Sequence, residues 1–355
     1  MHTSQKIKLT SLVFIAALFG FSSCKDDNPT DINTYDFQPI LGHLSQNVIT
    51  ETYIDLHTKS ELLVDAVTTL QGDATTSNLE AARQAWRNTR KPWEQSEGFL
   101  FGPVSTNGID PSIDSWPVNV VDLEAVLSSG AVLTKAYIDG LEGTLKGFHT
   151  IEFLLWGENG DKTIDAFTPR EFEYLIATSQ SLESDTYNLQ YSWNSTGENF
   201  QNEIAMAGES GSMYISQKSA MQEIINGMIA IADEVANGKI YDPLSQLDIT
   251  LEESRFSANS KEDFKDNIRS IQNLYEGKYL MDGSGISDFI LSKDADLDAH
   301  IKAEIQASID LIDAIPGTFT QAIFDNPAAI EAAQESVRHL QEELESEVKP
   351  LIDAI

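Results

Sequence analysis

Apolar residues recur every three or four positions through most of this chain, which is the spacing of an amphipathic helix. The stretch NLEAARQAWRNTRKPWEQSEGFLFGP shows this pattern, with Asn78 as its expected N-cap. Pro92 lies inside the stretch and should kink the helix or start a new turn. The apolar side of this helix is predicted to contain Leu79, Ala82, Ala85, Trp86 and Trp93.

Later segments repeat the helical spacing. The segment KSAMQEIINGMIAIADEVANG should end at Gly238, a favourable C-cap residue. Three more helices are predicted in DFKDNIRSIQNLYEGKY, LDAHIKAEIQASIDLIDAI and AAIEAAQESVRHLQEELESEVKPLIDAI. Loops rich in glycine, serine and proline separate these segments, and we find no alternating run that predicts a hairpin. The sequence therefore predicts an all-α protein of two packed helical bundles, each resembling a four-helix bundle.

Two of the predicted helices share a short pattern. GFHTIEFLLWG at 147–157 aligns with NIRSIQNLYEG at 267–277, with isoleucine, leucine and glycine at matching places. Arg269 then falls at the place of His149. The match indicates an internal duplication, and the alternative is chance similarity between amphipathic helices.

The N-terminus has the features of an export signal. Lys6 and Lys8 precede an apolar run that is too short to span a membrane. The run ends in FSSC, which resembles the lipobox of bacterial lipoproteins. We therefore expect a signal peptide at 1–23 and a lipid on Cys24, the only cysteine of the chain. An ordinary signal peptide with an incidental cysteine is the alternative.

The residues after Cys24 predict how the protein is arranged at the envelope. Residues 24–38 are polar and unpatterned, as expected of a flexible tether. CKDD also resembles a surface-export signal, so the protein is expected on the outer membrane, facing either the periplasm or the outside. Membrane lipid is the partner that Cys24 implies. The two bundles are predicted at 39–245 and 246–355.

The formal net charge is −33, and loss of Lys6 and Lys8 with the signal peptide takes it to −35. A field of this sign repels phosphate backbones, so nucleic acid is excluded as a partner.

The stretch LKGFHTIEFLLWG places a histidine and a glutamate three apart in an apolar run. On a helix, His149 and Glu152 lie on one face and could converge on one cation. Gly147 would allow another segment to come close. The alternative is a hydrogen-bonded pair that binds nothing. Because a metal ligand must be deprotonated, cation affinity is expected to fall as the pH drops through the histidine range near 6.5.

The surrounding pattern, GFHTIEFLLWG, resembles the GxHxxE signature of the imelysin family. AWRNTRKPWEQSEGFLFGP with IDPSIDSWP, and ESRFSANSKEDFKDNIRSIQNLYEG, resemble an earlier and a later block of that family. The resemblance covers roughly residues 40–355. It implies two helical bundles with the motif near their interface, a place in the bacterial envelope, and a link to iron uptake or metallopeptidase activity.

Other residues could complete a site. Glu94, on the earlier helix, and Asp114, in the proline-rich loop, are the expected further metal ligands, and the cofactor is expected to be a divalent or trivalent ion, iron or zinc. A solvated helix face is the alternative for Glu94 and Glu97, and a turn or cap role is the alternative for Asp110 and Asp114. Further candidates for the pocket are Glu97, Asp110, Arg255, Ser257, Trp86 and Trp93. Arg255 is expected to bind an anionic group, to neutralise the carboxylates or to form a structural ion pair. The other histidines are expected at surface or capping positions: His43, His57, His300 and His339.

Three functions fit these features. The first is an envelope lipoprotein that binds a metal ion and works with an envelope iron-transport partner. The second is a zinc peptidase, which needs an open metal position and a general base, although the chain has no HExxH motif. The third is a scaffold for a peptide or glycan, with a groove formed by Trp86, Trp93, Trp116 and Trp156. We favour the first, and the sequence does not decide whether catalysis occurs.

Overall fold

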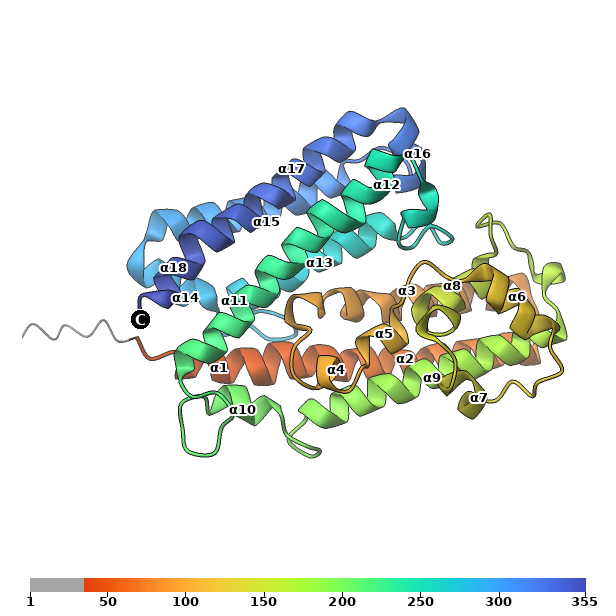
Figure 1. The fold of residues 1–355 in the computed structure, drawn as a ribbon, viewed down its shortest axis with the longest axis horizontal. Coiled ribbons are helices and arrows are strands. Elements are labelled where there is room, and N and C mark those ends of the chain that lie inside the picture. The colour runs from red at the N-terminus through yellow and green to blue at the C-terminus, as the bar shows by residue number, and fades with distance from the viewer. Residues whose placement is uncertain (1–34) are drawn as a thin grey trace, which may run out of the picture. The chain divides into compact units, whose positions relative to one another are not determined.

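Helices make up the regular structure of residues 35–355, the part of the chain that the computed structural model describes (Figure 1). Between residues 35 and 355 there is no strand, and the one β-bridge joins Lys278 and Asp282. The all-α prediction is confirmed. None of the helices in this part of the chain is both long enough and apolar enough to cross a membrane. The predictions for residues 1–23, for Cys24 and for most of the tether lie outside the described residues.

One group of helices packs around α2 (Thr50–Gly72), the long red helix of Figure 1. It packs along α3 (Thr76–Glu94) and α9 (Pro169–Trp193), and α8 (Gly147–Trp156) lies against both α3 and α9. The shorter helices that complete the N-terminal half are α1 (Gln38–His43), α4 (Pro103–Thr106), α5 (Asp110–Ile113), α6 (Val120–Ser128), α7 (Lys135–Asp139) and α10 (Gln201–Ala205).

A second group packs around α13 (Ser260–Glu276) and α17 (Pro327–Glu343), which both contact α11 (Gln217–Glu234) and α15 (Ala295–Asp313). Because α11 precedes residue 245, helices from both sides of the predicted boundary pack together. The boundary at 245/246 and the internal duplication stay predictions. The short helices of this half are α12 (Tyr241–Gln246), α14 (Ile286–Lys293), α16 (Phe319–Asp325) and α18 (Lys349–Asp353).

Two predicted helix ends are wrong. Thr75, rather than Asn78, caps α3, because the Thr75 hydroxyl accepts a hydrogen bond from the Asn78 backbone N–H. Gly238 does not end a helix, since it lies in a π-helical segment, Val235–Ile240, that joins α11 directly to α12. Pro92 sits in the last turn of α3, which ends two residues later.

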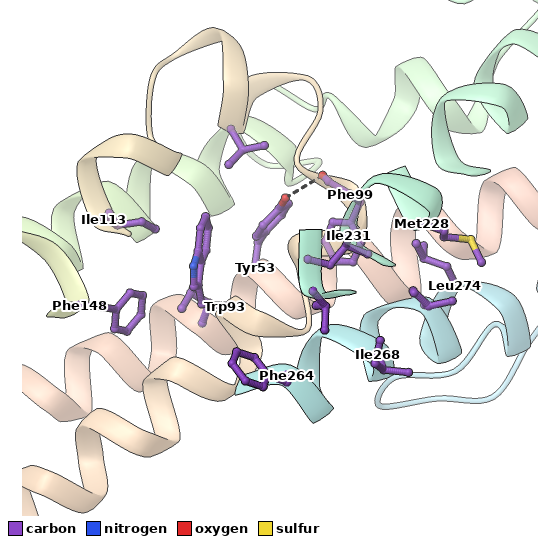
Figure 2. Packing of buried hydrophobic residues seen from close by; sticks show 14 of the residues in the cluster. Tyr53, Trp93, Phe99, Ile113, Phe148, Met228, Ile231, Phe264, Ile268 and Leu274 are labelled. Atoms are coloured by element: carbon purple, nitrogen blue, oxygen red, sulfur yellow. Dashed lines mark hydrogen bonds between the residues drawn. The ribbon is translucent and has the colours of Figure 1, made fainter. Parts of the chain in front are cut away.

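Helices α3 and α13 contact each other, and this contact carries much of the polar chemistry described below. Aromatic side chains surround it. The Trp93 ring stacks on Phe148 at 6.4 Å between centroids, and Figure 2 shows both beside Ile113. The Tyr53 hydroxyl donates to the Phe99 carbonyl in the same core. This apolar packing removes water, so charged groups enclosed by it must find partners within the protein.

Candidate metal centre

Helix α8 begins at a glycine that lies against another segment. Gly147 has a φ of 73°, in the left-handed region that favours glycine, and a Cβ atom there would overlap the carbonyl group of Ile113. Ile113 is the last residue of α5, and Asp114 follows it as the C-cap. The close approach expected at Gly147 is confirmed, and it brings Asp114 next to the first turn of α8.

His149 is buried in that first turn, with 1% of its surface exposed. Its Nδ1 lies 3.2 Å from Glu152 Oε2, so the one-face geometry of the motif is confirmed. Its Nε2 lies 3.1 Å from Asp114 Oδ1 but without the alignment of a hydrogen bond. The imidazole therefore has one nitrogen oriented by Glu152 and the other directed at an acidic neighbour.

Glu152 is fully buried and both of its oxygens are used. Oε2 contacts His149, and Oε1 accepts hydrogen bonds from the backbone N–H and the hydroxyl of Ser257, at 2.8 and 2.7 Å. Ser257 thus contacts the motif directly, and its place in a functional site stays a prediction. Because both carboxylate oxygens of Glu152 have partners, Glu152 orients the His149 ring and leaves no oxygen free for a ligand.

Arg90 stands at the centre of the acidic groups and was missed in the sequence. It is fully buried on α3, and its guanidinium contacts Asp114 and lies 2.6 Å from Glu94 Oε1 and 2.8 Å from Glu253 Oε1. Asp263 is a fourth neighbour, 3.6 Å from Nε. Such a set holds its geometry because each carboxylate would be costly to bury alone.

Lys239 supplies a second buried cation. Its Nζ lies 2.6 Å from Glu97 Oε2, 3.1 Å from Glu253 Oε1 and 3.6 Å from Glu94 Oε2. Asn267 donates to both Glu94 and Glu97. Glu94 and Glu97 are both buried, so the solvated-face alternative is wrong for both.

The buried network contains more negative than positive groups. Its carboxylates outnumber Arg90, Lys239 and a protonated His149 by six to three: Glu94, Glu97, Asp114, Glu152, Glu253 and Asp263. A cluster of this kind must take up protons or bind a further cation.

The pKa values report this excess of negative charge. Burial raises the pKa of Glu94 although Arg90 and Lys239 oppose the shift, and burial with the charge of Glu94 raises the pKa of Glu97 although Lys239 opposes it. Burial also raises the pKa of Asp263, to about 7. The pKa of His149 is raised to about 9, because its contacts with Asp114 and Glu152 outweigh burial and the charge of Arg90. The pKa of Asp114 is lowered against the effect of burial, chiefly by Arg90.

Ligand-type atoms come together at two places in this network. Asp114, His149 and Glu253 have such atoms within 4.8 Å of one another, and so does the group Glu94, Glu97, Asp114 and Glu253. His149 Nε2 and Glu253 Oε2 have no hydrogen-bond partner among the described residues. Both residues line a pocket of about 240 Å³ whose wall also includes Trp116 and Arg255. The pocket therefore reaches the residues that carry these two atoms, while the atoms themselves are buried.

The remaining predicted residues lie around this centre. Asp110 begins α5 outside both groups, and burial raises its pKa to about 6. Arg255 pairs with Glu158, 2.8 Å away, and forms no ion pair with the carboxylates of the buried network, so the neutralising role predicted for it has no contact there. Arg90 and Lys239 fill that role.

The predicted aromatic and histidine positions divide between core and surface. Trp86 packs in the core and donates to the Phe148 carbonyl, whereas Trp93 donates to Asp114 Oδ2. His57 is buried beside Thr186, contrary to its expected surface position. His300 and His339 are exposed and face acidic side chains.

The residues that the sequence missed are Arg90, Lys239, Glu253 and Asp263. Arg90 and Glu94 are spaced i,i+4, a pattern that usually marks an exposed ion pair on a helix. The available signal was their flanking by Trp86, Trp93 and Ala82, which places that helix face in the core.

A family model described as imelysin matches residues 49–346. This chain belongs to the imelysin family. The iron-regulated protein A of Synechococcus elongatus (strain ATCC 33912 / PCC 7942 / FACHB-805) is 27% identical over 347 residues, covering 94% of this chain and 90% of that protein.

Solved structures show the same imelysin fold. A protein of Parabacteroides distasonis ATCC 8503, whose structure is described as that of an iron-regulated protein A precursor, superposes with a TM-score of 0.81 at 28% identity, over 89% of this chain and 95% of that one. An imelysin-like protein of Psychrobacter arcticum 273-4 gives 0.72 at 14% identity, over 88% and 94% of the two chains, which supports the fold alone.

Proposed function

We propose that this imelysin-family protein binds a metal ion through His149, Asp114 and Glu253. The observation that carries the proposal is a buried pair of atoms in residues that line a pocket. Glu253 Oε2 has no hydrogen-bond partner among the described residues, and His149 Nε2 has only its ion-pair contact with Asp114, 3.1 Å away. Buried polar atoms are normally satisfied, so an ion shared by the three residues would complete their contacts. The excess of carboxylates gives the ion its compensating charge.

The donor set suits iron or zinc. One imidazole nitrogen and carboxylate oxygens are ligands that both ions accept, and the pocket leaves room for water or another ligand on the ion. Glu94 and Glu97 lie near the ion but are already bound to Arg90, Lys239 and Asn267. We propose that Glu94 and Glu97 contribute negative electrostatic potential at the ion without coordinating it.

Glu152 orients the histidine in this proposal. A metal-binding histidine commonly donates its second ring N–H to a carboxylate, which fixes the tautomer and strengthens the ligand. Glu152 Oε2 contacts Nδ1, and Ser257 holds Glu152 through its other oxygen. The sequence hypothesis that Glu152 is itself a ligand gives way here to this positioning role.

Iron acquisition is the process that we propose for the ion. Support comes from the names of two relatives, each called iron-regulated protein A. We propose an envelope or secreted location for this protein, which the relation to iron-regulated protein A supports. A lipid on Cys24, a position on the outer membrane and an envelope iron-transport partner remain parts of the proposal that rest on the sequence.

The peptidase alternative requires a general base beside a metal-bound water. Glu152 was the carboxylate that the motif offered, and both of its oxygens accept hydrogen bonds or face His149. The scaffold alternative needs tryptophans that line a groove, and Trp86 and Trp93 are instead buried in the core. Binding is therefore the function that the geometry supports best.

Calorimetric titration of metal-stripped protein with Fe²⁺, Fe³⁺ and Zn²⁺ tests the proposal. We expect one site per chain, lost in His149→Ala and in Asp114→Asn. Glu152→Gln should weaken binding about 10- to 100-fold, as expected when a partner that orients a ligand is removed. His300→Ala changes an exposed histidine and serves as the control. Binding that survives in all three site variants would refute the proposed ligand set.

A further inference from the structure

A second pocket lies beside the candidate metal centre and has a different character. It has a volume of about 710 Å³, within the range of small-molecule sites. Its wall includes Arg87 of α3, Trp156 at the end of α8, and Arg255 and Phe256. The chain has a formal net charge of −33, yet this wall carries two guanidinium groups and only one carboxylate, Glu158.

Aromatic rings hold both guanidinium groups. The Arg87 Cζ atom lies 4.8 Å from the centroid of the Trp156 ring, and the Arg255 Cζ atom lies 4.1 Å from that of Phe256. Stacking uses the flat face of a guanidinium and leaves its N–H edge available. An edge fixed in this way is preorganised to bind the two oxygens of a carboxylate or a phosphate.

Arg87 forms no close ion pair within residues 35–355, and the carboxylates of Glu80, Glu152 and Asp263 act on it only at longer range. Among residues 35–355, no carboxylate lies within ion-pair distance of it, and its hydrogen bond runs from Nη2 to the Ser257 carbonyl at 3.1 Å. Burial lowers the pKa of its guanidinium. The neighbouring Arg83, by contrast, donates to the Leu155 and Lys162 carbonyls and pairs with Glu80.

Arg255 already holds a carboxylate. It pairs with Glu158 Oε1 at 2.8 Å, and the Glu158 side chain is half exposed at the same pocket. Because the Glu158 side of this pair is open to solvent, the pair contributes little stability and a ligand could displace Glu158. Glu158 therefore shows where an external oxyanion would meet Arg255, and it also competes with one.

We propose that this pocket binds a small organic anion, with its carboxylate or phosphate group held by Arg87 and Arg255. The aromatic walls at Trp156 and Phe256 favour a ligand that also has carbon to pack against them. Binding here requires no cation at His149, although Ser257 lines this pocket and also donates to Glu152. The anion and the metal ion would thus bind through different residues, although Arg255 and Phe256 line both pockets.

Calorimetric titration of the metal-free protein with succinate, glycerol 2-phosphate and inorganic phosphate tests the proposal, with neutral succinamide as the reference. We expect saturable binding of at least one anion and none of succinamide. Binding by succinate assigns the carboxylate class, and binding by either phosphate compound assigns the phosphate class. No saturable binding of any anion, or equal binding of succinamide, would overturn the proposal.

Variants locate the site. Arg87→Gln and Arg255→Gln should each weaken binding about tenfold or more, since each removes charge-assisted hydrogen bonds. Glu158→Gln should strengthen binding, because Arg255 is released. Arg338→Gln, in an exposed pair with Glu335 on α17, is the matched control and should leave affinity unchanged. Equal weakening in Arg338→Gln would show an effect of net charge alone and refute the site.

Two further measurements protect this test. Arg87→Lys keeps the charge but loses the planar fork, so it should fold and still bind weakly. Anion binding by the metal-stripped wild type needs no ion at His149, which separates this proposal from the metal proposal. Melting temperatures of all variants show whether a lost affinity reflects a lost fold. Full affinity in Arg87→Lys and in Arg255→Gln would contradict the proposed roles of both arginines.

Discussion

The backbone of Gly147 packs directly against the carbonyl group of Ile113, and this contact sets Asp114 beside His149. Gly147→Ala should therefore push α5 away from α8. We expect a loss of about 1–3 kcal/mol in unfolding free energy from strain at a positive φ, and weaker metal binding in addition. Denaturant unfolding and zinc titration measure the two effects.

Gly108→Ala is the matched control for this contact. Gly108 also has a positive φ, 64°, but no atom lies within 4 Å of the place where a Cβ would be. This variant should show the backbone strain without the loss of metal affinity. If both alanine variants bind zinc as tightly as the wild type, the contact between Gly147 and Ile113 does not set the site.

The raised pKa of His149 predicts how stability and binding depend on pH. Its folded value of about 9 lies above the ordinary 6.5, so in metal-free protein its stabilising contribution is complete below pH 6.5 and is lost as the pH rises through 9. The stability difference between wild type and His149→Gln should shrink over this window. Thermal unfolding from pH 6 to pH 10 measures it, and a constant difference would contradict the assignment.

Metal binding should show the opposite trend. A metal ion must displace the proton of His149, so affinity should fall by up to about tenfold per pH unit below pH 9. The sequence alone predicts that metal affinity falls near pH 6.5. The contacts of His149 with Asp114 and Glu152 raise its pKa and therefore raise the pH at which affinity begins to fall. Calorimetry in buffers of different ionisation enthalpy should detect about one proton released per ion at pH 7.5. Binding without proton release would contradict a protonated His149.

Arg90 is predicted to hold the buried network together. Arg90→Met removes the cation that Asp114, Glu94 and Glu253 share, and leaves them without compensation. We expect a loss of about 3–5 kcal/mol at pH 7. Arg90→Lys keeps a charge in the same place and should lose less. A fully stable Arg90→Met in urea unfolding would show that the carboxylates are neutral or compensated elsewhere.

Lys239 is predicted to occupy a place where a cation could otherwise bind. Its ammonium lies among Glu94, Glu97 and Glu253, three members of a group with metal-ligand spacing. Lys239→Met should destabilise the protein by about 3–5 kcal/mol at neutral pH. Added Ca²⁺ should then raise the melting temperature of the variant more than that of the wild type.

Lys278→Met provides the comparison for Lys239, because Lys278 forms an exposed pair with Asp282. It should neither lower stability measurably nor create a response to Ca²⁺. An equal response to Ca²⁺ in wild type, Lys239→Met and Lys278→Met would show that the ion binds at the surface.

The sequence predicted the helices and half of the site for a clear physical reason. Helical spacing and the GxHxxE pattern are local, so α8, α13 and the pairing of His149 with Glu152 could be read directly. Asp114 could be named only through a resemblance, because its approach to His149 depends on packing between α5 and α8.

The site residues that the sequence missed come from segments that lie far apart in the chain. Glu253 and Lys239 reach Arg90 and Glu97 from more than a hundred residues away in the chain, because α13 packs against α3 and the π-helical segment packs against α13. No spacing rule predicts such a contact. Charged residues on an amphipathic helix ordinarily face solvent, so buried charge is what sequence patterns represent least well.

The position of the ion tests the central claim most directly. Crystals soaked with Zn²⁺ and measured at the zinc absorption edge would locate it by anomalous scattering. We predict one strong peak at about 2.0–2.2 Å from His149 Nε2 and from carboxylate oxygens of Asp114 and Glu253. Ligand-type atoms of these three residues lie within 4.8 Å of one another without an ion. His57, Glu61 and Glu183 form another group with this spacing, and a peak there with none at His149 would contradict the account.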